Sequence, residues 1–216
     1  MKRQYVALMG GAVLVLAFVF ASYSYRSQQA EEIAAVTDAA DSPLVRSHSP
    51  SAGPADAKVV LVEFFDPACE TCRVFSHHVK NILEQHPDKI RLVLRYAPFH
   101  QGSDTMVLIL EAARRQGKFW ETLDMMYATQ PQWASHHHPQ PEKIWQFLPA
   151  AGLDVDQVRI DMNDPKLRAA LDQDIADGRI LNVRKTPQFF VNDKPLQVFG
   201  LEPLKALIDF EIAVNY

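Results

Sequence analysis

Two cysteines lie three positions apart in this chain, and no other cysteine occurs among its 216 residues. Cysteine reacts as the thiolate, and a helix N-terminus stabilises that form because its first backbone N–H groups have no partner within the helix. After Cys69, apolar residues recur every three or four positions, which predicts a helix that starts there, with Cys72 one turn further along its apolar face. This arrangement predicts an exchangeable pair in which Cys69 meets the substrate and Cys72 is shielded.

A zinc site is the alternative for such a pair, since Cys-x-x-Cys supplies half of the ligands of one. The chain has no second cysteine pair, and His77 and His78 do not have the spacing of a zinc finger. The run His136, His137 and His138 allows a second hypothesis, a module that handles copper or zinc together with the cysteines. Because further soft ligands are missing, redox chemistry is favoured, and the histidine run is expected in a solvated loop.

A single carboxylate interrupts the apolar run that ends shortly before the cysteines. Residues 59–65 are nearly continuous in apolar side chains, which is typical of a strand buried on both faces of a parallel sheet, and Glu63 is the one charged residue in the run. Desolvation there raises the pKa of a carboxyl group toward a range useful for proton transfer. The alternative is a strand-end residue that points at solvent.

The elements that must position these residues alternate between strand and helix patterns. A second strand at residues 90–96 follows the cysteine helix, and the three elements make one right-handed crossover unit. Helical periodicity then extends over about residues 103–180, with Ser103 or Asp104 as a first cap. This stretch is expected to be a helical insert.

The insert and the end of the chain contain further predicted elements. Residues 142–151 show a helical pattern, and Asp164-Pro165 places a capping side chain before a proline at a helix start. Residues 188–191 and 196–199 are joined through Asn192-Asp193 and are expected to form a hairpin. A last helix is expected to begin at Glu202-Pro203.

Residues 1–26 differ from the rest of the chain. Lys2 and Arg3 precede an uncharged apolar stretch that runs to Ala21, and Arg26 follows it. The stretch is about 26 Å long as a helix, between a signal-peptide core and a full membrane span, so an uncleaved anchor and a cleaved signal both remain open. The charge asymmetry places the rest of the chain on the extracytoplasmic, for example periplasmic, side.

Residues 27–57 are rich in Ala, Ser, Asp, Gln and Pro, and are expected to be a flexible linker because they have few large apolar side chains. The last part of this segment, residues 44–46, is a candidate edge strand.

The composition of the whole chain is that of a globular protein, with 48% hydrophobic residues and a net charge of −4. Since the basic residues form no cluster, nucleic acid is not an expected partner.

With these features, residues 58–214 resemble the exported DsbA-type thiol-disulfide oxidoreductases of the thioredoxin superfamily. The resemblance rests on residues 62–65, the Cys69-Glu70-Thr71-Cys72 motif, the Thr186-Pro187 dipeptide before a strand, and the helical insert. It implies an α/β thioredoxin-like fold over residues 58–216 and an enzyme that needs no cofactor.

The resemblance also implies roles for individual residues. Cys69 would be the attacking thiol and Cys72 the resolving one, while Glu63 would shuttle the proton of Cys72. Pro187 would be a cis proline that faces the cysteines. The backbone of Thr186 would pair with the substrate, and Glu70 and Thr71 would also contact it.

The implied partners are exported proteins with cysteines and a redox partner that recycles the dithiol, with the membrane contacted through residues 1–26.

Strongly oxidising relatives carry a proline and a histidine where this chain has Glu70 and Thr71. An acidic Glu70 opposes the Cys69 thiolate and makes the disulfide harder to reduce, so a weaker oxidant is expected. Oxidase, isomerase and reductase activity all remain open. His100, after the second strand, is a further residue that can approach the site.

Overall fold

The computed structural model describes residues 14–25, 28, 42–134 and 139–216. The histidine run at 136–138 lies outside the described residues, as do residues 1–13 and 26 of the expected N-terminal segment and residues 27 and 29–41 of the expected linker.

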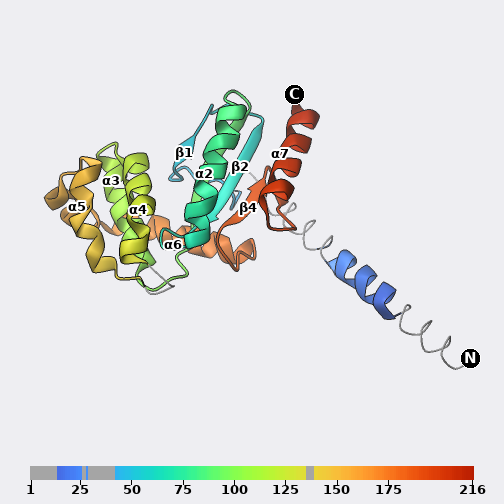
Figure 1. The fold of residues 1–216 in the computed structure, drawn as a ribbon, viewed down its shortest axis with the longest axis horizontal. Coiled ribbons are helices and arrows are strands. Elements are labelled where there is room, and N and C mark those ends of the chain that lie inside the picture. The colour runs from blue at the N-terminus through green and yellow to red at the C-terminus, as the bar shows by residue number, and fades with distance from the viewer. Residues whose placement is uncertain (1–13, 26–27, 29–41, 135–138) are drawn as a thin grey trace, which may run out of the picture.

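The described chain contains a five-stranded sheet in the order β1-β3-β2-β4-β5 (Figure 1). The central strands β2 and β3 run parallel, and the other neighbours pair antiparallel. The parallel pair flanks α2 in the chain, so the expected crossover unit is confirmed. The strands are β1 Ser51–Ala52, β2 Val59–Phe65, β3 Ile90–Tyr96, β4 Gln188–Val191 and β5 Lys194–Pro195.

Helices cover this sheet and form the insert, which confirms the expected α/β fold. In Figure 1, α3, α4 and α5 group together to one side of the strands, while α2 and α7 lie along the sheet. The helices that follow β1 are α2 Glu70–Gln85, α3 Ser103–Arg115, α4 Phe119–Trp133, α5 Val155–Asp161, α6 Pro165–Ile180 and α7 Leu201–Asn215, with 3-10 turns at η2 Pro141–Gln146 and η3 Leu148–Ala151.

The two faces of the sheet bury separate hydrophobic clusters because side chains alternate along each strand. Leu61 and Phe65 of β2 join the larger cluster, which contains residues of α2, α3, α4 and α7. Val62 and Phe64 join the smaller cluster with Leu181, which follows α6. Glu63 therefore points to the α2 side of the sheet, where Cys72 also lies.

Several predicted elements differ from the observed ones. Residues 142–151 form 3-10 turns rather than one helix, and Pro149 lacks the N–H donor that a continuous helix would need there. The second strand of the hairpin is Lys194–Pro195 rather than 196–199, since Phe199 instead packs on Phe75 of α2, with ring centroids 4.7 Å apart. Helix α5, capped by Asp154, was not predicted.

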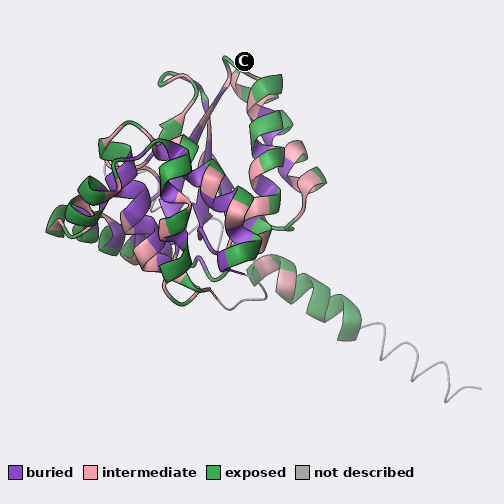
Figure 2. Ribbon diagram, turned by 60° about the vertical axis from the view of Figure 1, so that its left-hand side comes forward, coloured by how far each residue is buried: buried purple, intermediate pink, exposed green. Residues whose placement is uncertain are grey.

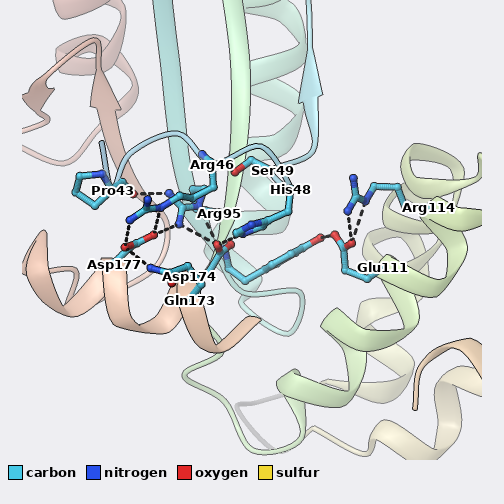
Figure 3. A network of polar contacts seen from close by, with 11 residues as sticks. Pro43, Arg46, His48, Ser49, Arg95, Glu111, Arg114, Gln173, Asp174 and Asp177 are labelled. Carbon is cyan, nitrogen blue, oxygen red and sulfur yellow. Dashed lines mark hydrogen bonds and ion pairs between the residues drawn. The ribbon is translucent and has the colours of Figure 1, made fainter. Parts of the chain in front are cut away.

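The flexible linker was predicted to extend to residue 57, which is too far along the chain. Within residues 42–57, several side chains pack on the domain. Leu44 is only 3% exposed and lies among the residues of the smaller cluster. Arg46 donates two hydrogen bonds of 2.8 Å to the carboxylate of Asp177 on α6 (Figure 3). The edge strand is Ser51–Ala52 rather than 44–46, and it pairs with β3. Burial of one leucine and a two-point ion pair stabilise this segment despite its polar composition.

Residues 14–25 form a helix whose apolar side chains are mostly exposed (Figure 2). Leu14 and Phe18, for example, are 72% and 73% exposed. Within residues 14–25, 28, 42–134 and 139–216, no helix has the length and apolar character needed to span a membrane.

Candidate active site

Cys69 is the N-cap of α2, as the sequence predicted, and its thiol is accessible only in small part. Its Sγ accepts a hydrogen bond of 3.4 Å from the backbone N–H of Cys72, and the residue is 6% exposed. Hydrogen bonding from Cys72 outweighs burial and lowers the pKa of Cys69 to about 6. The thiolate is therefore the main form of Cys69 at neutral pH.

Cys72, one turn into α2, has the opposite character. It is fully buried, and burial together with the hydrogen bond to Cys69 raises the pKa of its thiol well above the usual value. Both cysteines are in the free form in this structure. The pair thus combines an ionised, partly accessible sulfur with a protonated, shielded one.

Glu63 lies on the same side of the sheet as Cys72 and is buried. It is 4% exposed, and its register on β2 places it between Leu94 of β3 and Phe189 of β4. Burial raises the pKa of its carboxyl to about 8, and the negative charge of Cys69 adds to this effect. Glu63 is therefore not a solvent-facing strand end, and it remains largely protonated at neutral pH.

Glu63 also lines a cavity of about 190 Å³ between the sheet, α2 and α4. Most of the lining is apolar, but it includes Ser76, Tyr127 and the paired charges of Lys80 and Asp124. A carboxyl group in such a cavity keeps its raised pKa because few polar groups compete with burial.

The loop before β4 reaches the cysteines from another part of the chain. The Thr186-Pro187 peptide bond is cis, as expected, and Pro187 is buried. The Sγ of Cys69 lies 3.4 Å from the carbonyl oxygen of Thr186. Five of the predicted site residues are thereby brought together from β2, α2 and this loop: Glu63, Cys69, Cys72, Thr186 and Pro187.

The remaining candidates lie further along α2 or on its surface. Thr71 is exposed and Glu70 half-buried in the first turn of the helix. His77 is exposed, and the ring of His78 packs against Phe75. Among the described residues, no group of three or more His, Cys, Asp or Glu side chains is arranged to hold a metal ion.

Asp66 is a site residue that sequence reasoning missed. Its carboxylate is fully buried and accepts hydrogen bonds from the backbone N–H of Ala68 and the hydroxyl of Ser103. It also accepts hydrogen bonds from the backbone N–H groups of Phe99 and His100, and pairs with the imidazole of His100. Ser103 was expected as a helix cap, but its hydroxyl serves Asp66 instead. An aspartate before a proline looks like an ordinary turn in sequence, which hides this role.

Gln130 of the insert supports the same turn from α4. Its side-chain amide donates to the carbonyl oxygens of Pro67 and Cys69, at 2.9 and 3.1 Å, and its oxygen accepts from Arg73. Gln130 is 1% exposed, so these carbonyl groups are satisfied by a buried side chain rather than by water. The insert therefore fixes the conformation of the cysteine turn.

Comparisons with known proteins agree with this geometry. A family model described as "Thioredoxin" matches residues 46–210. A solved thioredoxin-like oxidoreductase from Silicibacter pomeroyi DSS-3 is 28% identical, with a TM-score of 0.69, and the alignment covers 80% of this chain and 97% of that one. The fold is also that of the thiol-disulfide exchange protein alpha-DsbA2 from Wolbachia pipientis, at 20% identity, a TM-score of 0.68 and coverage of 87% and 97%.

The curated relatives are much longer proteins. The Na(+)/H(+) antiporter NhaA of Herminiimonas arsenicoxydans is 29% identical over 145 residues, which are 67% of this chain but 22% of the antiporter. The chain thus spans less than a quarter of the length of this relative, and the similarity concerns one part of it.

Proposed function

This chain belongs to the thioredoxin family, and we propose that it is a thiol-disulfide oxidoreductase that exchanges its Cys69-Cys72 pair with cysteines of exported proteins. The observation that carries the proposal is the placement of two thiols one helical turn apart: Cys69 is the N-cap of α2 and accepts the N–H of Cys72, and Cys72 is fully buried. A pKa of about 6 makes Cys69 the nucleophile and the good leaving group, whereas the raised pKa of Cys72 keeps that thiol protonated.

In the oxidising direction, a substrate thiolate attacks the Sγ of Cys69 in the disulfide. The Cys69–Cys72 bond breaks, its electron pair moves to the Sγ of Cys72, and Glu63 supplies the proton. A second substrate thiolate then attacks the substrate sulfur of the mixed disulfide and expels Cys69 as a thiolate. The substrate dithiol loses two electrons, and this chain takes them up as the Cys69 thiolate and the Cys72 thiol. The two protons of the substrate thiols pass to solvent, and Glu63 regains one proton from solvent.

The same groups support the reverse reaction and isomerisation. The Cys69 thiolate attacks a substrate disulfide, and Cys72 resolves the mixed disulfide after its proton passes to the Glu63 carboxylate. A carboxyl with a pKa of about 8 exchanges protons readily near neutral pH, which suits both directions. A redox partner with its own reactive cysteines must restore the starting form after each net oxidation or reduction.

The substrate chain is proposed to bind beside the cis Thr186-Pro187 bond and the exposed first turn of α2. The Thr186 backbone pairs with an extended substrate segment, and Glu70 and Thr71 contact its flanks. Because Thr186 already lies at Cys69, a substrate aligned on it delivers its sulfur to the nucleophile.

Reduction of insulin and refolding of a substrate with scrambled disulfides test this function in the full chain, with Cys69→Ser as the inactive comparison. We expect turnover by the wild-type chain and none by Cys69→Ser. The alternative function, metal handling, is checked in the same preparations by measuring bound copper and zinc. Stoichiometric metal without any dithiol activity would overturn the proposal.

We also propose that residues 1–26 direct the domain out of the cytoplasm and tether it to the membrane. The proposal rests on the basic start of the segment and on the apolar side chains of the helix at residues 14–25. Fractionation of cells that produce the full chain, with alkaline carbonate extraction and N-terminal sequencing, separates tethered from cleaved forms. A full-length chain in the cytoplasmic fraction would contradict both the export and the membrane tethering.

A further inference from the structure

The loop between β3 and α3 brings a histidine to the turn that precedes Cys69. The Nδ1 atom of His100 lies 2.8 Å from the Oδ2 atom of Asp66. The backbone of Asp66 holds the other side of the arrangement, since its carbonyl oxygen accepts the N–H of Cys69 at 3.0 Å. His100 and Cys69 are therefore anchored on one buried residue.

The loop that carries His100 has little freedom to move away. Asp66 binds the backbone N–H groups of Phe99 and His100, at 2.7 and 2.9 Å, and the hydroxyl of Ser103 at 2.6 Å. Gly102 within the loop adopts a φ of 76°, and a Cβ at this position would clash with the ring of Pro141. The imidazole is thus held in place by the folded insert.

The surroundings of His100 favour its charged form. The hydrogen bond with Asp66 raises the pKa of His100 against the effect of partial burial, and the negative charges of Asp66, Cys69 and Glu70 raise it further. The side chain is 19% exposed, so it lies at the rim of the site rather than in the core. The charges of Cys69 and Glu70 both favour a cation at this position.

We propose that His100 is a positioning residue of the exchange reaction, which as a cation held by Asp66 stabilises the Cys69 thiolate and offsets the charge of Glu70. This inference rests on the proposed function and deepens it. The basic group of the site then comes from the β3–α3 loop instead of from between the cysteines. When the disulfide is reduced, the two sulfurs gain two electrons. Cys72 becomes a thiol, and Cys69 becomes a thiolate that His100 stabilises. The reduced form is favoured, which makes the disulfide more oxidising.

The test compares His100→Asn with the wild-type full chain. Asparagine can still donate to Asp66 but carries no charge, and His77→Asn, on the exposed face of α2, is the matched control. Two readouts are used, the thiolate absorbance of Cys69 against pH and the equilibrium of the dithiol with glutathione. We expect His100→Asn to lower the thiolate fraction at fixed pH, and the oxidising power in the glutathione equilibrium, by about threefold to tenfold. His77→Asn should match the wild type.

Two further variants separate charge from structure. His100→Lys restores a cation without the imidazole and is expected to recover most of the thiolate fraction. In a Glu70→Gln background, a smaller effect of His100→Asn is expected, because the charge of Glu70 helps to keep His100 protonated. If His100→Asn lowers only the melting temperature, or leaves both readouts within twofold of His77→Asn, the inference is wrong. A wild-type chain without any dithiol exchange would instead overturn the proposed function.

Discussion

Two groups of buried ionisable side chains lie on opposite faces of the same sheet and behave in opposite ways. Glu63 of β2 points to the α2 side, forms no ion pair with any residue that the structure describes, and holds its proton up to a pKa of about 8. Arg95 of β3 points to the α6 side and binds the carboxylates of Asp174 and Asp177 (Figure 3). All four side chains are nearly or fully buried.

The partner of a buried carboxyl, rather than its burial alone, decides what the group can do. Burial opposes ionisation of Asp177, but hydrogen bonds from Arg46, Arg95 and Gln173 outweigh it and lower the pKa. Such a group stays ionised and ties the N-terminal segment, β3 and α6 together. A carboxyl left without a cation keeps a proton that it can pass to a neighbouring sulfur.

Removing the charge of Arg95 is expected to have the largest effect on stability. Arg95→Met leaves two carboxylates buried without their central partner and is expected to lower the free energy of unfolding by about 3 to 5 kcal/mol. Urea unfolding measures this, with Lys118→Met, at an exposed ion pair with Glu121, as a control that should stay near the wild type. Exchange activity per folded molecule should survive in Arg95→Met. A stable Arg95→Met chain without activity would mean that the two faces are not separate in role.

Glu63→Gln is the matching change on the other face of the sheet. Whereas Arg95→Met lowers the free energy of unfolding, Glu63→Gln is expected to raise it. The unfolded carboxyl loses its proton near the usual pKa of 4.5, while the folded one keeps it to about 8, so Glu63 costs stability increasingly as the pH rises through this window. In the reduced chain at pH 8, the variant should be more stable by about 4 kcal/mol. Below pH 4.5 this gain should vanish.

The same variant should be a poorer catalyst, because glutamine cannot exchange protons with Cys72. Exchange rates in insulin reduction should fall on the order of 10-fold to 100-fold. Equal stability of Glu63→Gln and wild type at pH 8, or equal rates, would argue that the Glu63 carboxyl is solvated and plays no part in proton transfer.

Gln130→Leu removes a neutral polar partner on the active-site side of the sheet. The carbonyl oxygens of Pro67 and Cys69 then lose their buried donor, at an expected cost of about 1 to 3 kcal/mol. Thermal unfolding measures the loss, and Gln132→Leu, on an exposed position of the same helix, should show almost none. If both variants melt alike, the insert does not support the cysteine turn.

Glu70→His has the smallest expected effect, because Glu70 is only half-buried and its charge is partly screened. Removing the negative charge and adding a basic group beside Cys69 should shift the glutathione equilibrium toward the dithiol by up to about tenfold, which corresponds to about 30 mV. Glu70→Gln separates the two contributions. An unchanged or lower reduction potential in Glu70→His would show that this position does not tune the disulfide.

Local patterns in the sequence were enough to predict the active-site side of the molecule. The spacing of Cys69 and Cys72 with the helical periodicity after them gave the reactive and the shielded thiol, and one charge in an apolar strand gave the buried Glu63. The cis Pro187 followed from the family resemblance rather than from the residues themselves.

The α6 side could not be predicted, for a physical reason. Arg95 and Asp177 are 82 positions apart, and Arg46 and Asp177 are 131 apart, so nothing local links them. A charged residue at a strand end or in a polar segment looks solvent-facing until its partner is known. The same holds for Asp66, whose contacts with His100 and Ser103 span more than 30 positions.

The different roles of Cys69 and Cys72 are tested most directly by measuring which sulfur reacts, and at what pH. The reduced full chain is alkylated briefly at a series of pH values, and modified Cys69 and Cys72 are quantified by peptide mass spectrometry. We predict that Cys69 is modified with a midpoint near pH 6, while Cys72 stays protected throughout the neutral range. Modification of Cys72 first, or a midpoint for Cys69 near the ordinary value of 9, would contradict the account.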